Sequence, residues 1–370
     1  MSMTAERSAA PALATAAAAP AMPLSVILPN FNHGALIARA LRALVDQTPP
    51  AKEIIVVDDG STDDSVSVVE ALQQRHASIR LIRHPTNRGI IAAVKSALEV
   101  ATGDYVLFAS SDDCVLSGLF GRALAGLTAY PQAAFFCASV GLMDTRNRVI
   151  GLRPVTVPRR GAGYLSPIDV RRAIRTTDFW VIGTATVYRR RLLAEAGYFD
   201  ARLGSITDVL TNRLLAFRHG FYFDPAILAV YNKDPMSFSG RNALSATASR
   251  RLLDAAGAWI IDNLPPDVRD EHRDLFDRRM GFGLARLGVV WRRGTLDTAA
   301  IANIVNFGPA DRKLLAALAR LPFVSGTLVL GWLTMRLRPF GTWALIGAWW
   351  RALRFAWFTR EAIQRQVDNL

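Results

Sequence analysis

Cysteine is scarce in this chain, which has only Cys114 and Cys137 among its 370 residues. Two cysteines outside a CxxC spacing exclude a disulfide framework and a cysteine-based zinc site, and they indicate reduced thiols in a core. GxGxxG and GxxxxGK[ST] motifs are absent, which argues against a dinucleotide-binding Rossmann enzyme and a P-loop NTPase. GxSxG and HExxH are also absent. The histidines lack ligand spacing, and we expect structural or surface roles for His33, His76, His84, His219 and His272.

The N-terminus lacks the continuous apolar run of a signal peptide. Residues 1–22 are rich in alanine and proline, and we expect them to form a disordered tail. Without an export signal, we expect the main body of the protein to stay in the cytoplasm.

Acidic residues are few, because 31 carboxylates face 44 lysines and arginines and leave a formal net charge of +13. This balance favours an anionic partner, and nucleic acid, an acidic membrane surface or phosphorylated substrates would each satisfy it. Hydrophobic residues make up 51% of the chain. That share is ample for a large core and excludes global disorder.

Short apolar runs alternate with helical patterns in the first part of the chain. The apolar runs cover residues 24–29, 53–57, 79–82 and 105–109. Alternation of strand and helix predicts right-handed crossovers and a mixed, mainly parallel sheet with helices on both faces. We therefore expect an α/β domain over residues 23–240, followed by a helical, basic, tryptophan-rich region over residues 241–370.

Polar clusters follow three of these strands. They are Pro29-Asn30-Phe31-Asn32, Asp58-Asp59-Gly60-Ser61 and Ser110-Ser111-Asp112-Asp113. In open α/β sheets ligands bind at the carboxyl ends of the strands, near the switch in strand order. The three clusters therefore predict a binding site along one edge of the sheet. Asn32 also has the residue type of a helix N-cap.

The paired carboxylates allow more than one interpretation. Asp112 and Asp113 can hold a hard divalent cation through oxygen ligands, or they can cap a helix expected over residues 116–127. A cation there would clamp a diphosphate and stabilise its charge as it leaves. Asp58 and Asp59 can accept hydrogen bonds from a base N–H or from ribose hydroxyls, or they can simply form an Asp-Gly turn.

Residues 24–239 resemble family 2 of the inverting glycosyltransferases, which have the GT-A fold. The matching segments are LSVILPNFN (24–32), EIIVVDDGSTDDS (53–65), NRGIIAAVKSAL (87–98), GDYVLFASSDD (103–113) and GYFDARL (197–203) followed by Asp208. The second motif is very specific, and the order of the whole set strengthens the resemblance.

The resemblance implies a metal-dependent, inverting hexosyltransferase using Mg²⁺ or Mn²⁺ at Asp112 and Asp113. Asp208 would be the general base that deprotonates an acceptor hydroxyl, whose oxygen displaces nucleoside diphosphate from the anomeric carbon. The donor would be a nucleotide-sugar, by default a UDP-sugar, and the acceptor a saccharide or a lipid-linked sugar in cell-surface polysaccharide or glycolipid assembly. Asp59 would lie nearest the base. The implied nucleotide-binding residues are Pro29, Phe31, Asp58, Asp59, Gly60, Ser61 and Asn87.

Two departures from the family pattern support an alternative. Ser110 stands where the acidic motif usually begins with Asp, and Thr207 stands where the base is commonly preceded by Glu. The protein could then be a weak or inactive nucleotide-binding scaffold, with Asp208 as an ordinary helix N-cap. A nucleotidyltransferase would usually carry a glycine-rich, basic loop after the first strand, and residues 29–34 are neither.

The C-terminal region concentrates both charge and tryptophan. Residues 312–370 contain nine basic and two acidic residues and five of the eight tryptophans. Their uncharged runs, 321–335 and 339–350, are shorter than the roughly 20 residues that span a bilayer. Trp and Arg beside short apolar segments are typical of interfacial helices, so we expect contact with an anionic membrane, peripheral on the inner face of the cell membrane.

Two other interpretations of this region exist. A helical subdomain could pack its apolar faces on the catalytic domain and leave its arginines in water. Nucleic acid would also suit the charge, but the sequence has no recognised nucleic-acid module and its basic residues alternate with long apolar runs. We therefore expect no nucleic-acid partner.

Overall fold

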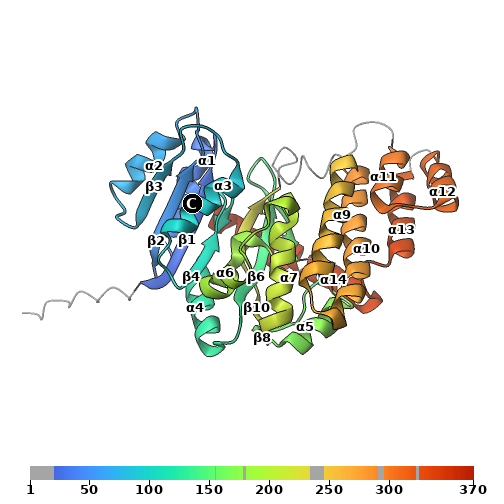
Figure 1. The fold of residues 1–370 in the computed structure, drawn as a ribbon. Helices are drawn as coiled ribbons and strands as arrows, with labels where there is room; N and C mark the ends of the chain where they lie inside the picture. Colours follow the sequence, from blue (N-terminus) through green and yellow to red (C-terminus); the bar gives the residue numbers. More distant parts are fainter. Residues whose placement is uncertain (1–20, 155, 178–180, 234–245, 291–295, 322–324) are drawn as a thin grey trace, which may run out of the picture.

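The core of the protein is one mixed sheet of ten strands (Figure 1). It is seen in a computed structural model that describes residues 21–154, 156–177, 181–233, 246–290, 296–321 and 325–370. Most of the predicted tail lies outside these residues, and β1 begins at Met22, one residue inside it. The strands are β1 (Met22–Asn30), β2 (Ala51–Asp58), β3 (Ile79–Arg83), β4 (Tyr105–Phe108), β5 (Cys114–Val115), β6 (Phe135–Met143), β7 (Val149–Arg153), β8 (Gly163–Leu165), β9 (Thr186–Arg189) and β10 (Phe221–Asn232).

The first four strands pair in parallel, as the alternating pattern predicts. The order is β3-β2-β1-β4-β9-β6-β10-β5, with β7 beside β6 and β8 beside β10. Strand β9 is antiparallel to both β4 and β6, while β6 and β10 are parallel. The chain moves outward from β1 to β3 and then returns to the other side of β1 at β4. The switch in strand order therefore lies between β1 and β4, where the carboxyl ends of parallel strands form a crevice.

Helices cover both faces of the parallel part of the sheet. Alternate β1 side chains, such as Leu24 and Val26, pack under α1 (Gly34–Val45), α2 (Ser65–Gln73) and α4 (Leu119–Ala129). Ile27 points to the opposite face, where α3 (Ile90–Val100) packs on it. The two-residue period of a strand explains why the runs are apolar at almost every position: both faces are buried.

A second cluster of apolar side chains lies under the later strands. It gathers residues of β6, β9 and β10 with α5 (Pro167–Ile174), α6 (Arg190–Glu195) and α7 (Thr207–His219). Two short 3-10 segments, η1 (Gly183–Ala185) and η2 (Ala201–Ile206), precede β9 and α7. Helix α7 is buried along nearly its whole length, because α9 (Ala246–Asn263) contributes to the same cluster and covers it.

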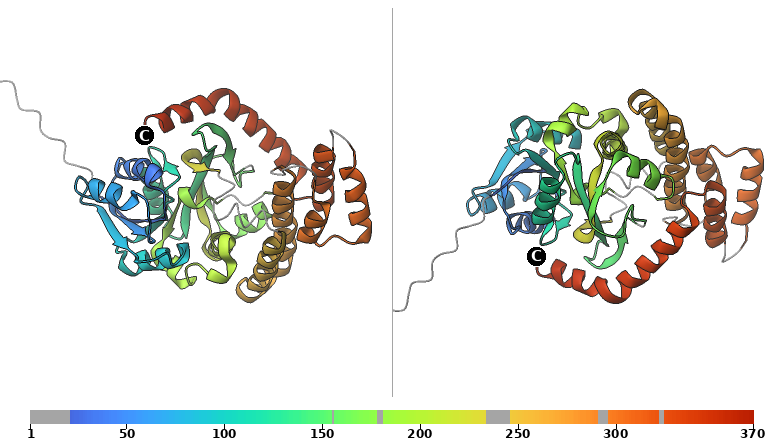
Figure 2. Two further views of the ribbon diagram at one scale, coloured as in Figure 1. Left: turned by 90° about the horizontal axis from the view of Figure 1, so that it is seen from above. Right: turned by 90° about the horizontal axis from the view of Figure 1, so that it is seen from below.

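The C-terminal helices have a core of their own and then return to the sheet. Side chains of α10 (Pro266–Val290), α11 (Thr298–Val305), α12 (Pro309–Ala319) and α13 (Ser325–Leu337) form a separate cluster. The last helix consists of α14 (Thr342–Arg354), the π-helical segment η3 (Phe355–Thr359) and α15 (Arg360–Asp368). Figure 2 shows it running along one side of the molecule, from the C-terminal helices to the N-terminal ones.

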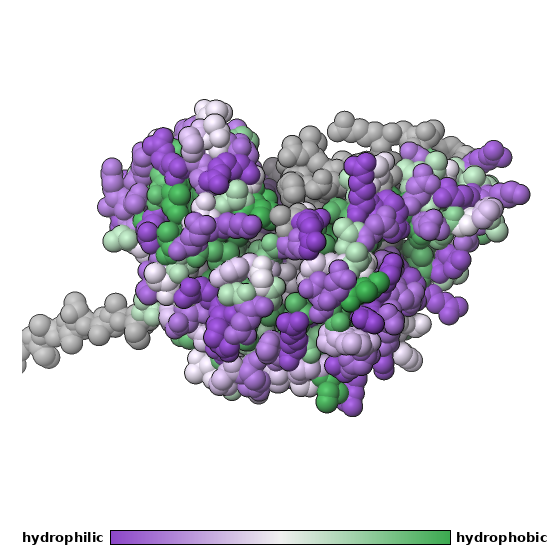
Figure 3. Space-filling view, viewed as in Figure 1, coloured by the Kyte–Doolittle hydropathy of each residue, from purple (hydrophilic) through white to green (hydrophobic). Residues whose placement is uncertain are grey.

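The predicted architecture is confirmed: a mixed α/β sheet with helices on both faces, followed by a C-terminal helical region. Within the described residues, the helices are all too short or too polar to cross a bilayer. The face drawn in Figure 3 is mostly hydrophilic, with small hydrophobic areas between charged groups.

Candidate functional site

Asp58 joins the loops that follow β1 and β2. Asn30 and Asp58 are register partners at the carboxyl ends of the two strands, and the Asn30 side-chain amide donates to Asp58 (3.0 Å). The backbone N–H of Ser61 donates to the other Asp58 oxygen (2.9 Å). Asp58 is buried. Its carboxylate therefore fixes the shape of the turn rather than facing solvent.

Asp59 organises the next loop along the edge. Its buried carboxylate accepts hydrogen bonds from the backbone N–H groups of Arg88 (3.0 Å) and Gly89 (2.7 Å). Its partner on the other side is the ring of His84, with Nδ1 2.6 Å from an Asp59 oxygen. The second ring nitrogen of His84 lies 3.0 Å from the hydroxyl of Ser96 on α3. The carboxylate thus connects β2, the end of β3 and α3.

His84 is the residue at this edge that the sequence analysis undervalued. It is buried, as a structural histidine would be, but it also contacts a predicted site residue. The overlooked indication is its position directly after β3, at the same edge as the other polar clusters. No basic residue stands next to Asp59 in the sequence. Its partner His84 comes instead from the end of β3, which lies beside β2.

Gly60 allows two loops of the edge to touch. Its φ is +77°, and a Cβ at this position would lie 2.7 Å from the backbone carbonyl carbon of Thr86. Any other residue would therefore be strained in conformation and would collide with the loop. In that loop the side-chain oxygen of Asn87 accepts a hydrogen bond from Gly89 N–H (3.0 Å).

The loop after β1 contributes an exposed aromatic ring. The side chain of Phe31 is 42% exposed, and Pro29 is partly exposed at the end of β1. Asn32 is not the N-cap of α1, because His33 occupies that position. Asn32 instead accepts a hydrogen bond from Thr62 N–H (2.8 Å), which ties the first loop to the second.

The acidic motif after β4 contains two carboxylates in different environments. Buried Asp113 accepts hydrogen bonds from Asn232 N–H (2.8 Å) and from the Thr184 hydroxyl. Burial and the nearby charge of Asp112 raise the pKa of Asp113. Asp112 is partly exposed and accepts a hydrogen bond from the Ser110 hydroxyl.

Neither carboxylate caps a helix. Strand β5 follows the motif, and α4 begins only at Leu119 with Gly118 as its N-cap. The capping alternative is therefore wrong.

A cation at this site would need ligands from a bound substrate as well as from the protein. Groups of three or more His, Cys, Asp or Glu that could bind a metal do not occur among the described residues. The protein donors are therefore a carboxylate pair, of which Asp112 is the more accessible. Mg²⁺ is commonly held by one or two carboxylates together with substrate phosphates and water. The residues present fit a divalent cation bound in that way.

Asp208 lies in the first turn of α7. Ile206 is the N-cap of α7, so the N-cap interpretation of Asp208 is wrong. Its carboxylate accepts a hydrogen bond from Val209 N–H (2.8 Å), and burial raises its pKa to about 6. A Cβ built on Gly183 would lie 4.0 Å from Asp208 Oδ2.

Segment η1 therefore connects the two acidic groups. Gly183 lies beside Asp208, and its neighbour Thr184 donates to Asp113. A further contact closes the edge: His33 Nδ1 is 2.6 Å from the Ser111 hydroxyl, which joins the loop after β1 to the loop after β4. The predicted nucleotide-binding residues thus lie along one edge with the acidic motif and Asp208.

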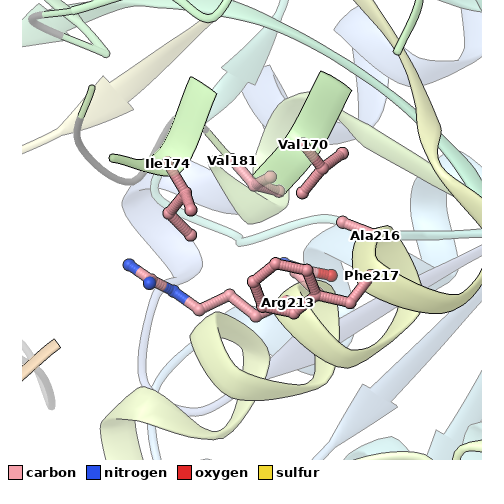
Figure 4. Close-up of a pocket in the computed structure, with 7 residues that line it drawn as sticks. Val170, Ile174, Val181, Arg213, Ala216 and Phe217 are labelled. Carbon is pink, nitrogen blue, oxygen red and sulfur yellow. The ribbon is translucent and has the colours of Figure 1, made fainter. Parts of the chain in front are cut away.

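A separate small pocket lies away from this edge, between α5 and α7 (Figure 4). Its walls are mainly apolar, with the Arg213 side chain along one side. The lining residues are Val170, Ile174, Val181, Asn212, Arg213, Ala216 and Phe217. None of the predicted site residues lines it.

The arrangement agrees with comparison to known proteins. Residues 25–197 match the family model described as glycosyl transferase family 2. The chain carries a glycosyl transferase family 2 domain. This domain contains all the predicted site residues except Asp208, which follows it by 11 residues.

Relatives of two kinds match this chain. The uncharacterized glycosyltransferase YibD of Escherichia coli (strain K12) is 39% identical over 97 residues, which cover 26% of this chain and 28% of that protein. The succinoglycan biosynthesis protein ExoU of Rhizobium meliloti (strain 1021) is 29% identical over 326 residues, 86% of this chain and 90% of that protein. The first match is confined to a segment, whereas the second runs through the C-terminal region as well.

Solved structures share the fold of the family 2 domain at low identity. S. aureus TarS 1-349 in complex with UDP aligns with a TM-score of 0.56 at 18% identity, covering 84% of this chain and 88% of that one. The mannosyltransferase PcManGT from Pyrobaculum calidifontis, in complex with GDP-Man and Mn²⁺, aligns with a TM-score of 0.52 at 20% identity, covering 92% and 90%. At these identities the likeness shows the fold.

Proposed function

We propose that this chain is an inverting glycosyltransferase that moves a sugar from a UDP-sugar to an acceptor hydroxyl. One observation carries the proposal: in η1, Gly183 lies beside Asp208 and the adjacent Thr184 donates a hydrogen bond to Asp113, at the edge that also carries Asp58 and Asp59. A base and an acidic motif next to a nucleotide pocket are the groups that a single displacement with a diphosphate leaving group needs.

The nucleotide would lie along the loops after β1, β2 and β3. The exposed Phe31 ring offers a surface on which a base can stack. An ionised carboxylate has about four lone-pair sites, so Asp59 retains room for a base N–H beside its present partners. Asp58, Gly60, Ser61 and Asn87 shape the pocket through the turn and loop contacts described above.

Asp208 would act as the general base. With a pKa of about 6 it is ionised at neutral pH and is a better proton acceptor than an ordinary Asp. It would take the proton of the acceptor hydroxyl as the oxygen attacks the anomeric carbon and nucleoside diphosphate leaves. One displacement inverts the configuration at that carbon.

Asp112 would hold Mg²⁺ or Mn²⁺, with Asp113 behind it. A bound cation would supply positive charge to the diphosphate as it leaves. Asp113 keeps Asp112 in place through the buried hydrogen bonds that anchor the motif to η1 and β10. The Mn²⁺ in the structure of the Pyrobaculum calidifontis mannosyltransferase supports the cation, and the UDP and UDP-GlcNAc complexes of TarS support the donor class.

The acceptor would belong to cell-surface polysaccharide or glycolipid assembly. The names of two relatives support this proposal: the succinoglycan biosynthesis protein ExoU, and the poly(ribitol-phosphate) beta-glucosyltransferase of Bacillus spizizenii (strain ATCC 23059 / NRRL B-14472 / W23). The second is 36% identical over 97 residues, which cover 25% of this chain and 15% of that protein. The cytoplasmic location and the division at residue 240 stay predictions.

Calorimetric titration of UDP into the full chain, with and without Mn²⁺, tests the proposal. We expect Mn²⁺ to tighten UDP binding about tenfold or more, and Asp112→Asn to remove that gain while keeping the metal-free affinity within about threefold. The control is Asp144→Asn, a partly exposed carboxylate on the turn after β6 that pairs with Arg148. Tighter binding of GDP than of UDP would overturn the donor class, and binding of neither would overturn the nucleotide site. UDP binding without turnover of any UDP-sugar would instead favour the scaffold alternative.

A further inference from the structure

The last helix carries a row of large aromatic side chains on its outside. Their exposed fractions are 84% for Trp343, 61% for Trp350, 79% for Trp357 and 80% for Phe358. Trp349 and Ile346 are also exposed beside them. We call these six side chains the aromatic face. Single exposed apolar residues are ordinary, but a contiguous aromatic strip marks an interaction surface.

The orientation of this helix is fixed by its other side. Ala348, Phe355 and Ile363 are buried, and the Arg351 guanidinium reaches inward to the Ser139 hydroxyl of β6 (2.6 Å) and the Pro154 carbonyl. Gln364 on α15 accepts a hydrogen bond from Val149 N–H of β7 (2.8 Å). Because the inner side is held by the sheet, the aromatic face is directed away from it.

Unpaired arginines lie next to the aromatic face. Arg354 and Arg360 are exposed and form no ion pair with any part of the chain that the structure describes. The chain as a whole carries a formal net charge of +13. Aromatic rings beside free arginines on one side of a helix are the composition of helices that lie in the headgroup region of a membrane.

We propose that the aromatic face docks on an anionic phospholipid bilayer, with the last helix lying in the plane of the headgroups. The rings would enter the boundary between headgroups and acyl chains, while Arg354 and Arg360 would contact lipid phosphates. Charge complementarity favours lipid over a second copy of this chain. A two-fold contact through the same face would bring its arginines against their own copies in the partner.

Docking in this orientation would bring the bilayer near the candidate site. Ile363 and Val367 of α15 pack against Leu116, Met143 and Val149. Leu116 follows Asp113 by three residues, so the docked helix lies behind the acidic motif. A lipid-linked acceptor carried in the same bilayer could then approach the edge of the sheet. This consequence for the acceptor rests on the proposed function, whereas docking itself does not.

Co-sedimentation of the full chain with vesicles tests the docking. The vesicles are phosphatidylcholine alone, or phosphatidylcholine with about one third phosphatidylglycerol. We expect the chain to pellet with the anionic vesicles and to remain in solution with the neutral ones. Combined Trp343→Ser, Trp350→Ser and Trp357→Ser should lower the partition coefficient about tenfold or more. The matched control is Ile168→Ser, an exposed apolar residue on α5, which should leave it unchanged.

A second variant separates charge from the aromatic rings and does not depend on the triple variant folding. Arg354→Gln with Arg360→Gln should weaken binding to anionic vesicles about 25-fold at low salt, at about fivefold per arginine. Wild-type protein that stays in solution with anionic vesicles would overturn the proposal. A wild-type dimer that dissociates in the triple tryptophan variant would also overturn it, since the aromatic face would then join two copies of the chain. UDP titration of the same samples separates the two proposals. UDP binding without vesicle binding would contradict docking alone and leave the proposed function standing.

Discussion

Asp208 sits where a carboxylate is poorly stabilised. Its carboxylate accepts a hydrogen bond from the N–H of the next residue, and burial raises its pKa to about 6. Asp58 and Asp59 differ, because each is surrounded by donors from neighbouring loops. An acid kept short of donors retains its affinity for a proton, which is the property a general base requires.

We expect Asp208→Asn to lower sugar transfer about 10²- to 10⁴-fold, because the amide cannot accept the proton of the acceptor hydroxyl. UDP affinity should stay within about twofold, since Asp208 would contact the acceptor rather than the nucleotide. The wild-type rate should also fall below about pH 6 as Asp208 becomes protonated. Turnover measured against pH, together with UDP titration, checks both expectations.

The stability of the same variant provides the control. The folded pKa of Asp208 lies above the 3.8 of an ordinary Asp side chain, so the folded protein binds the extra proton between these values. Stability is then lost as the pH rises through that window, and removing the charge should raise the free energy of unfolding by about 3 kcal/mol at pH 7.5. The gain should vanish below about pH 4. A variant that is strongly destabilised at pH 7.5 would point to a structural role for Asp208.

The last helix illustrates how one element depends on a distant part of the chain. Residues of η3 and α15 complete the apolar cluster formed by β6, β7 and β10, although they follow those strands by more than 100 residues. Arg351 lies about two turns from Trp343, and its side chain is directed between the last helix and the sheet. Burial there lowers its pKa to about 10. It remains charged at neutral pH and must therefore keep its hydrogen-bond partners.

We expect Arg351→Met to lower the free energy of unfolding by about 1–3 kcal/mol, because it leaves the Ser139 hydroxyl and the Pro154 carbonyl without their partner. Methionine keeps most of the volume and apolar length of arginine. The matched control is Arg354→Met, one turn away and exposed, which should change stability by less than about 0.5 kcal/mol. Urea unfolding at neutral pH measures both. Equal effects of the two substitutions would show that the inward contacts of Arg351 contribute little.

At the scale of the whole molecule, the charge of +13 should influence ligand binding as well as membrane contact. UDP carries negative charge, and a positively charged protein attracts it over distances that salt screens. The Debye length falls from about 10 Å at 0.1 M to about 3 Å at 1 M ionic strength.

We therefore expect UDP affinity to fall about three- to tenfold when sodium chloride rises from about 50 mM to about 500 mM. Uridine, which lacks the diphosphate, should show less than about a twofold change over the same range. Calorimetry of both ligands in the same buffers makes the comparison. An equal salt dependence for UDP and uridine would show that the charge of the protein contributes little to UDP binding.

The parallel part of the sheet and its polar edge could be predicted because their causes are local. Strands β1 and β2 are short apolar runs ending at turn residues, and helical periodicity separates them. Once a βαβ pattern is recognised, the handedness of the crossover places the carboxyl ends of the strands at one edge. That rule predicted the positions of Asp58, Asp59 and Asp112 without any structure.

The rest depended on contacts between residues far apart in sequence. His84 meets Asp59 because β3 lies beside β2, and 71 residues separate Thr184 from the Asp113 that it contacts. Arg351 reaches Ser139 across 212 residues. The sequence by itself determined the fold class, the edge that carries the site and the amphipathic, basic character of the last helix. Only the tertiary structure decided which carboxylates are buried, which side of that helix faces outward and how η1 lies beside both Asp208 and Asp113, because burial and hydrogen bonding are set by packing between distant segments.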